Sequence, residues 1–454
     1  MTFRRLTLAA AVAACTVAAV PQAASAGRLE VAVQDDLLFL HRGAEAGSYF
    51  SRDLAFEKVR AMQGSVLRVN LIWTHALAND QVYLKRKPKR VRYDWAAYES
   101  LVELARGYGV KVQFSLTGPA PAWATASGDA HRGWWRPNPR HFKQFVRAAA
   151  RRFKGKVDRY SIWNEPNYRT WLGPPREAAW RYRQLYQLSY RMIKRISPRA
   201  KVLFGETSPY KTRHAIPPLK FLRRAACVDR RYRPTKRAVR ERGAPLLSRK
   251  RCSGGPLEAD GYAHHPYEFK RPPARSQRGK DDVTLGSLDK LTKALDRLKR
   301  SGALVPRRGA RLPLYLTEYG YFRAGDRKIS ERRRAKWTVK GFRLAAKNPR
   351  VKQLLYYVLV RPPGGTFFDL SLLDHDGDET RAYRALVRWA TRAAERREVK
   401  RPRRKRDGVS DTDPPPPPAG EPPPPPPGEP PPEEPPCEIL PGIPCPEFFS
   451  TLNL

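Results

Sequence analysis

Short apolar runs alternate with longer amphipathic stretches along most of this chain. From about Gly27 to Glu395, runs rich in β-branched and aromatic residues recur, a pattern typical of buried strands. In the stretches between them, apolar residues recur every three or four positions, as in helices that pack on one face. The predicted strands are 29–34, 66–73, 110–116, 157–164, 201–206, 259–265, 312–318 and 351–359.

This regular alternation predicts a fold class. A helical pattern follows each of the eight predicted strands, which indicates a parallel sheet, and eight strands can close into a (β/α)8 TIM barrel. An open doubly wound sheet is the alternative, but no GxGxxG motif opens the first helix, so its nucleotide-binding version has no support. Segment 228–255 interrupts the rhythm before the sixth strand, on the face opposite the one that holds active sites in barrels.

The two ends of the chain differ from its middle. Residues 1–26 carry Arg4 and Arg5, an apolar run and a final Ala-Ser-Ala, which predicts a signal peptide and a secreted protein. Neither this run nor any later stretch is long enough for a membrane span. We expect the barrel to fill residues 27–395, with a disordered basic and Pro-rich linker at 396–436 and a short cysteine-containing tail at 437–454.

The cysteines support an oxidising compartment. Four remain once Cys15 of the predicted signal peptide is set aside, and an even number suggests disulfides. Three pairings are possible, and we favour the two local ones, Cys227–Cys252 and Cys437–Cys445. The chain has no CxxC motif, which argues against zinc binding and thiol redox chemistry.

The charge is strongly positive. The chain has 88 Lys and Arg residues against 43 Asp and Glu residues, a formal net charge of +45. Such a charge raises the possibility of a nucleic-acid or polyanion binder, but the basic residues are spread along predicted helices and no nucleic-acid-binding motif is present. We interpret the charge as a solvated basic surface that favours contact with anionic cell-wall polymers.

Two predicted strands end in glutamate. The fourth runs into Trp-Asn-Glu-Pro at 163–166, and the seventh runs into Thr-Glu-Tyr-Gly at 317–320. In a barrel the carboxyl ends of the strands meet, so Glu165 and Glu318 should lie close together. Cleavage of a glycosidic bond needs such a pair, one carboxyl group protonated and the other ionised. Pro166 ends the strand and fixes the backbone that follows Glu165.

These motifs resemble those of clan A retaining glycoside hydrolases, in the neighbourhood of families five and thirty-nine. The resemblance covers residues 29–395 and implies that Glu165 is the acid/base and Glu318 the nucleophile. It also implies that Asn164 binds the sugar 2-hydroxyl group and that Arg68 lies beside the nucleophile. No cofactor is implied.

The sixth strand carries the sequence His-His-Pro-Tyr, which resembles a motif near the nucleophile and implies roles for His265 and Tyr267. His264 and His265 point to opposite faces of a strand, and we prefer His265 in the site. Neither histidine has a third ligand at a recognisable spacing, so we expect no metal.

Aromatic residues at strand ends are candidate sugar platforms, although such residues are also ordinary core. We predict substrate contacts for Trp73 and Trp123, and the other candidates are Trp163 and Tyr321. Many clan members carry tryptophan at the end of strand eight, where this chain offers Tyr356, Tyr357 or Arg361. This departure leaves the substrate open, and an arginine there would suit an acidic sugar.

The sequence thus supports a secreted, monomeric retaining glycosidase that acts on a β-linked saccharide. A non-catalytic carbohydrate- or wall-binding barrel is the main alternative. A polyanion binder is a third hypothesis that rests on charge alone. The acidic turn 374–378 is interpreted as a polar turn and not as a calcium site, because its glycine is out of place for an EF-hand.

Overall fold

The computed structural model describes the barrel and parts of what flanks it. The described ranges are 28–40, 51–235, 252, 254–276, 279–307, 311–361, 368–411, 438–440 and 443–444. The predicted signal peptide and the predicted Cys437–Cys445 bridge lie outside these ranges. Both therefore stay predictions.

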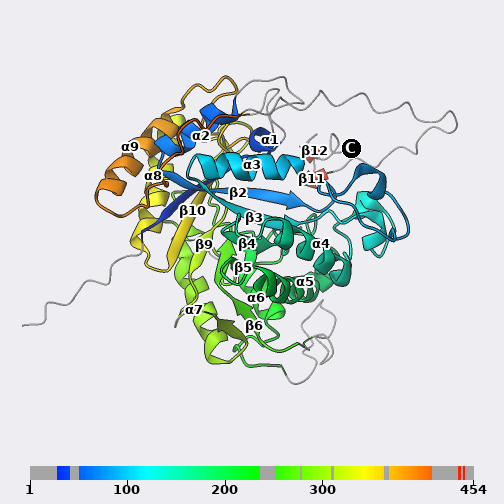
Figure 1. Ribbon diagram of the computed structural model, residues 1–454. Helices are drawn as coiled ribbons and strands as arrows, with labels where there is room; N and C mark the ends of the chain where they lie inside the picture. The colour runs from blue at the N-terminus through cyan, green and yellow to red at the C-terminus, as the bar shows by residue number, and fades with distance from the viewer. Residues whose placement is uncertain are drawn as a thin grey trace, which may run out of the picture.

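Eight parallel strands close into a barrel (Figure 1). The first strand pairs with the second and also with the last, so the sheet has no free edge. The result confirms the predicted (β/α)8 barrel and rules out the open sheet. Around the barrel the strands are β1 (Glu30–Gln34), β2 (Gly64–Ile72), β3 (Lys111–Thr117), β4 (Arg159–Ile162), β5 (Lys201–Thr207), β7 (Gly261–His264), β9 (Leu314–Leu316) and β10 (Val351–Tyr357).

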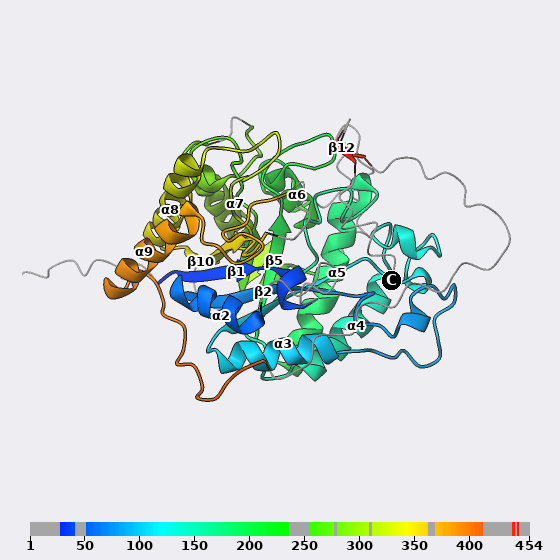
Figure 2. The same cartoon turned by 90° about the horizontal axis from the view of Figure 1, so that it is seen from above.

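Helices surround the barrel, as the view from above shows (Figure 2). The core lies largely between the strands and the helices, where apolar faces of both are buried. Among the described residues, three of the connections contain short 3-10 helices, at Asn79–Gln81, Ala122–Ala124, Ala130–Arg132 and Leu285–Ser287. The α-helices are α1 (Asp36–Phe39), α2 (Arg52–Ala61), α3 (Ala96–Gly107), α4 (Pro139–Arg152), α5 (Pro175–Ile196), α6 (Pro218–Ala225), α7 (Leu288–Arg300), α8 (Glu331–Lys347) and α9 (Arg381–Glu395).

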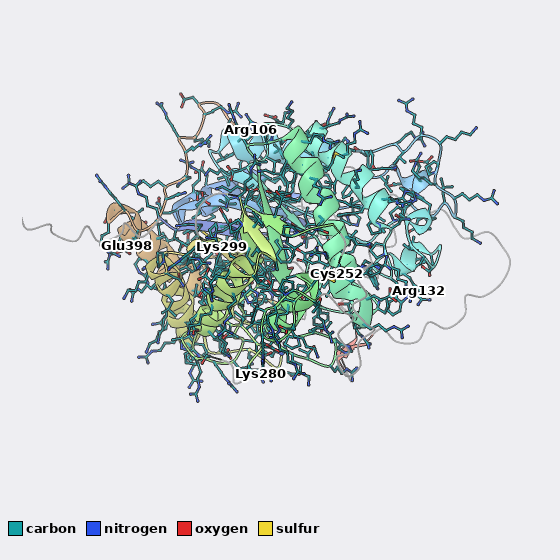
Figure 3. All side chains as sticks on the ribbon, turned by 90° about the horizontal axis from the view of Figure 1, so that it is seen from below. Arg106, Arg132, Cys252, Lys280, Lys299 and Glu398 are labelled. Carbon is teal, nitrogen blue, oxygen red and sulfur yellow. A yellow bond between two sulfur atoms is a disulfide. The ribbon has the colours of Figure 1, made fainter. Side chains whose placement is uncertain are left out.

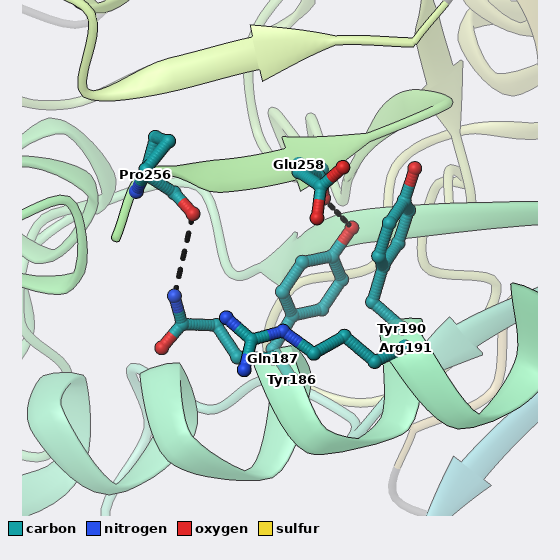
Figure 4. Close-up of a pocket in the computed structure, with 6 residues that line it drawn as sticks. All are labelled: Tyr186, Gln187, Tyr190, Arg191, Pro256 and Glu258. Carbon is teal, nitrogen blue, oxygen red and sulfur yellow. Dashed lines mark hydrogen bonds between the residues drawn. The ribbon is translucent and has the colours of Figure 1, made fainter. Parts of the chain in front are cut away.

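A second, two-stranded parallel sheet lies outside the barrel and was not predicted. It consists of β6 (Leu257–Ala259) and β8 (Leu304–Pro306). Helix α5 holds β6 in place: the Tyr186 hydroxyl donates to the carbonyl oxygen of Glu258 at 2.8 Å, and the Gln187 amide donates to that of Pro256 at 3.3 Å (Figure 4). Strands of three residues are too short to give a periodic signal. The antiparallel pair β11 (Glu438–Leu440) and β12 (Ile443–Pro444) completes the strands.

The predicted Cys227–Cys252 disulfide is present, with the two Cα atoms 5.9 Å apart. It joins the end of α6 to the approach of β6 and closes a loop with a sequence separation of 25 residues. A crosslink of this span restricts the unfolded chain.

Removing this crosslink should destabilise the fold. We expect the Cys227→Ser/Cys252→Ser variant to lose about 3 kcal/mol of unfolding free energy, the loop-closure estimate for such a span. Urea denaturation of variant and parent under non-reducing conditions measures the difference. Equal denaturation midpoints and slopes would show that the bridge does not stabilise the barrel.

The chain stays ordered beyond α9, contrary to the prediction that order ends at Glu395. Residues 396–411, here called the C-terminal strap, run along the barrel and can be followed from α9 toward α3 in Figure 2. The amide of Arg403 donates to the carbonyl oxygen of Gly109 at 3.0 Å, and Asp411 accepts from Arg52 Nε at 2.7 Å. Backbone hydrogen bonds and ion pairs thus hold a segment whose composition alone indicated disorder.

Charged side chains are distributed over the surface. In Figure 3, nitrogen-tipped side chains project from every side of the outline, in line with the solvated basic surface inferred from the sequence. Among the described residues, no helix combines the length and the hydrophobicity that crossing a bilayer requires.

Candidate active site

The carboxyl ends of the barrel strands bring the predicted residues together. Glu165 follows β4, Glu318 follows β9, and His265 follows β7, while Arg68 lies on β2 and points inward. The backbone of Glu165 has a φ of 33°, in the left-handed region that non-glycine residues rarely adopt. Such backbone conformations are concentrated at functional sites, where the surrounding structure compensates for them.

Glu318 is held by a buried cation and a phenol. Arg68 Nη1 donates to Glu318 Oε1 at 2.9 Å, and the Tyr267 hydroxyl donates to Oε2 at 3.0 Å. Arg68 is fully buried, and the Glu318 side chain is 11% exposed. Burial raises the pKa of Glu318 above its ordinary value, and the charges of Glu165 and Glu206 add to this rise, although the charges of His265 and Arg68 oppose it. Because both hydrogen bonds are donated to the carboxylate, they favour its ionised form.

Glu165 lies across the site from Glu318. Its Oε1 accepts from His265 Nδ1 at 2.9 Å, and its side chain is 17% exposed. One carboxylate oxygen of Glu165 and one of Glu318 lie within 4.8 Å of each other. The two strand-end glutamates of the sequence therefore form a close pair, with Glu165 the more exposed of the two.

A third carboxylate, Glu206, completes the cluster and was missed in the sequence. It is fully buried at a β-bulge of β5 and accepts from His265 Nε2 at 2.7 Å, Thr317 Oγ1 at 2.8 Å and Arg68 Nη2 at 3.2 Å. Burial alone would raise its pKa, but the charge of Arg68 and the hydrogen bond from His265 lower the pKa to about 2. The predicted strand 201–206 also ends in glutamate, a signal equal in kind to those at Glu165 and Glu318.

His265 lies among all three carboxylates. Besides its bonds to Glu165 and Glu206, its Nδ1 is 3.4 Å from Glu318 Oε2. Burial alone would lower its pKa, but the charge of Glu318 and the hydrogen bonds to Glu165 and Glu206 raise the pKa to about 10. A protonated imidazole has no lone pair for a metal, so this cluster does not suit one. His264 points away, as expected, and bonds to Thr207 Oγ1 at 2.9 Å.

Asn164 is fixed by the same arginine. Its Oδ1 accepts from Arg68 Nη2 at 2.8 Å, which turns the amide nitrogen away from Arg68. Arg68 also donates to the amide oxygen of Gln34, at the end of β1, a contact for which the sequence gave no signal. One buried guanidinium thus orients side chains from β1, β5 and the ends of β4 and β9.

The barrel matches those of solved glycoside hydrolases. A family 39 glycoside hydrolase from the gut symbiont Bacteroides cellulosilyticus WH2 superposes with a TM-score of 0.52 and 15% identity, covering 81% of this chain and 64% of that chain. A glucosidase from Croceicoccus marinus gives a TM-score of 0.52 and 13% identity, covering 81% and 69%. The fold is the barrel of these hydrolases. No protein-family model and no curated protein matches the sequence.

At these identities the likeness establishes the fold, and the chemistry must come from the site itself. The chain also spans slightly less than two thirds of the family 39 enzyme, 64% of its length. The close carboxylate pair and its buried cations are therefore the basis for a functional conclusion.

The tryptophans predicted to bind substrate belong to the core instead. Trp73 is fully buried and stacks on Phe145 with ring centroids 5.6 Å apart. Trp123 packs edge-on against Trp73 at 5.8 Å and donates its Nε1–H to the carbonyl oxygen of Gln81 at 3.0 Å. Both predictions are wrong, because at these positions the side chains point toward the helices. Trp163 and Tyr321 are also buried.

The end of β10 presents a tyrosine to the site. Tyr357 packs against the cluster that contains Tyr267, the tyrosine that bonds to Glu318, and burial and the charge of Glu318 raise the pKa of Tyr357. Tyr356 points outward, 3.4 Å from Arg334 on α8. Arg361, the arginine considered for an acidic sugar, instead pairs with Asp369 at 3.4 Å. Residues 374–378 form a hydrogen-bonded turn, as interpreted from the sequence.

Glu206 should control how the site responds to pH. The stability that Glu206 contributes is present above about 4.5, its ordinary pKa, and is lost as the pH falls toward about 2. The contribution of His265 is complete below 6.5 and is lost as the pH rises through about 10. We expect Glu206→Gln to lose about 3 kcal/mol of unfolding free energy, because a buried ion pair is broken. Its alkaline loss of stability should also begin at a lower pH, because His265 loses a carboxylate partner.

Melting temperature measured across the pH range, for the parent protein, Glu206→Gln and the charge-conserving Glu206→Asp, tests this expectation. Glu206→Asp should keep most of the alkaline stability. Identical pH profiles for the parent and Glu206→Gln would show that Glu206 does not set the protonation of His265.

Proposed function

We propose that this protein is an exported retaining glycoside hydrolase that cleaves O-glycosidic bonds of a β-linked oligo- or polysaccharide by double displacement. The observation that carries the proposal is the carboxylate pair, with oxygens of Glu165 and Glu318 within 4.8 Å of each other. Retaining glycosidases hold their two carboxyl groups about 5–5.5 Å apart, whereas inverting ones leave about 6.5–9.5 Å for a water molecule.

In the first step, Glu318 attacks the anomeric carbon while Glu165 gives its proton to the leaving oxygen. The bond from the anomeric carbon to that oxygen breaks, and an ester with Glu318 forms. Arg68 and Tyr267 keep Glu318 ionised and aligned. In the second step, Glu165 takes a proton from water, whose oxygen displaces Glu318 and releases the sugar with its original stereochemistry.

Double displacement needs Glu165 to act first as an acid and then as a base. Arg68 and His265 supply two positive charges, which Glu206 and Glu318 balance. Esterification of Glu318 removes one of these negative charges, so the charge of the cluster changes between the two steps.

Substrate contact by Asn164 is part of the proposal, since its amide nitrogen bonds to no other described residue and can donate to a sugar hydroxyl. The Cys227–Cys252 disulfide supports export, because disulfides persist in oxidising compartments. A purely carbohydrate-binding barrel would gain nothing from two mutually repelling carboxylates, and this argues for catalysis.

Product stereochemistry tests the proposal. We expect the purified protein to hydrolyse at least one aryl β-glycoside, and proton NMR of the first-formed sugar should show the β-anomer. An α-anomer as first product would contradict double displacement. Saccharide binding without turnover of any glycoside in a broad panel would favour the carbohydrate-binding barrel.

A further inference from the structure

Three arginines lie around the mouth of the candidate site, on three different connections. Arg169 follows β4, Arg213 follows β5 and Arg327 follows β9. Since each connection leaves the carboxyl end of its strand, all three lie on the catalytic face. Arg169 and Arg213 are exposed and Arg327 is partly buried.

The first two arginines are tied to the acid/base candidate through a joined pair of loops. The Tyr168 amide donates to the carbonyl oxygen of Glu165 at 2.8 Å, and the Arg169 amide donates to that of His214 at 2.8 Å. Arg213 Nε donates to His214 Nε2 at 2.6 Å. Burial lowers the pKa of His214, and the charges of Arg169 and Arg213 lower it further. The imidazole therefore stays neutral and adds no positive charge to that of the arginines.

Arg327 lies over two phenylalanine rings, one of which stacks on the tyrosine that bonds to the nucleophile candidate. Its guanidinium carbon is 5.4 Å from the ring centroid of Phe269 and 5.7 Å from that of Phe322. Phe269 stacks on Tyr267 at 4.7 Å, and Tyr267 bonds to Glu318. A cation–π contact attracts the guanidinium group without using its N–H donors in a hydrogen bond.

The loops that carry the three arginines are in contact. Tyr168, next to Arg169, forms a β-bridge with Ala215 on the loop that carries Arg213. Tyr210 of that second loop packs edge-on against Phe269, with ring centroids 6.5 Å apart, and Arg327 lies over the same Phe269. Burial and the charge of Glu165 raise the pKa of Tyr168, and the charges of Arg327, Arg169 and Arg213 oppose this rise.

These arginines lack the carboxylate partners that others on the same face have. Arg361 pairs with Asp369 at 3.4 Å, and Arg323 pairs with Asp374. Within the described ranges, none of the three mouth arginines forms an ion pair with a carboxylate. The mouth therefore carries three guanidinium groups that pair with no described carboxylate. Positive charge focused at a cleft attracts anionic ligands.

We propose that the saccharide cleaved at this site is an anionic glycan whose carboxylate or sulfate groups bind Arg169, Arg213 and Arg327. This inference rests on the proposed glycosidase function, because it names the substrate class of the same site. Guanidinium groups bind carboxylates and sulfates through paired N–H donors. Arg169 lies on the same connection as Glu165, and Arg213 lies on the loop bonded to that connection, so both are on the Glu165 side of the mouth.

The first test compares β-linked glycans of one backbone in carboxylated, sulfated and neutral form. We expect a higher kcat/KM on an anionic form, falling as salt is added because exposed charges are screened. The better of the two anionic forms identifies the group that the arginines bind. Equal or better hydrolysis of the neutral form would overturn the inference.

A matched pair of variants tests whether the preference for anionic glycans comes from the three mouth arginines. The Arg169→Gln/Arg213→Gln/Arg327→Gln variant should lower the ratio of kcat/KM on the anionic form to that on the neutral form by about 10- to 100-fold. Arg147, Arg388 and Arg392 are exposed on α4 and α9, and their triple glutamine variant has the same net charge and should keep the parent ratio. An equal fall in both variants, or no fall in either, would overturn the inference.

An aryl β-glycoside without charge separates this inference from the function on which it rests. Loss of its hydrolysis in Glu318→Ala supports the glycosidase function whatever the glycan preference. If the parent protein hydrolyses the aryl glycoside and prefers neutral glycans, only the anionic substrate class is wrong. If the parent protein hydrolyses no glycoside, the function itself is wrong.

Discussion

Glu318→Ala will reduce kcat on aryl β-glycosides by at least about 10⁴-fold, because it removes the group that forms the covalent intermediate. The loss should be equally large for good and poor leaving groups, since the attacking carboxylate is needed for both. The protein should stay folded, because alanine removes one buried carboxylate and leaves Arg68 paired with Glu206. Steady-state kinetics and a thermal melt of the same preparation measure both effects.

Azide, a small anionic nucleophile, provides a second test of the role of Glu318. Azide can occupy the space left by the Glu318 side chain and attack the anomeric carbon once, which yields an α-glycosyl azide from a β-glycoside. The control is Glu57→Ala on α2, which removes an exposed carboxylate that pairs with Lys405 at 2.7 Å and should keep full activity. Glu318→Ala with parental kcat would disprove the assigned role of this residue.

Glu165→Ala will show a different dependence on the leaving group. For a poor leaving group we expect kcat/KM to fall by about 10²- to 10⁴-fold, the range for loss of general acid catalysis. For an activated aryl leaving group, which needs no proton, kcat/KM should change little. The second step should then become slow, because no general base remains to activate water.

Azide distinguishes the two glutamates. In Glu165→Ala it should attack the ester of Glu318 without base assistance and give a β-glycosyl azide, together with a higher turnover rate. A burst of released aryl alcohol before the steady state would report the accumulated intermediate. An equal fall in kcat/KM on poor and activated substrates, with no effect of azide, would contradict the acid/base assignment.

The barrel was predictable from the sequence because each strand and helix carries its own periodic signal. The ends of these elements were harder to infer. Trp73 lies just past β2, and the backbone there turns the side chain toward Phe145 and not toward the barrel mouth. Period-two alternation does not extend past the end of a strand, so the sequence left both directions open.

The candidate site was predictable where a motif marked it. Glu165 and Glu318 lie within the tetrapeptides Trp-Asn-Glu-Pro and Thr-Glu-Tyr-Gly at strand ends, and Arg68, His265 and Tyr267 lie where the resemblance implied. Glu206 ends the predicted strand 201–206 and was overlooked, but the bulge of β5 at this residue is a pairing irregularity that appears only when neighbouring strands are aligned. The mouth arginines could not be found from sequence either, because their common feature is the lack of a carboxylate partner in space.

The C-terminal strap has a consequence for when the molecule can fold. The Leu29 amide donates to the carbonyl oxygen of Glu398, and Lys400 pairs with Glu30 across 370 residues of sequence. Neighbouring β1 pairs only with β2 until β10 has been synthesised. Contacts between such distant residues form slowly, and partly folded chains expose unpaired strand edges. A growing chain therefore carries one unpaired edge of β1 until β10 has been made.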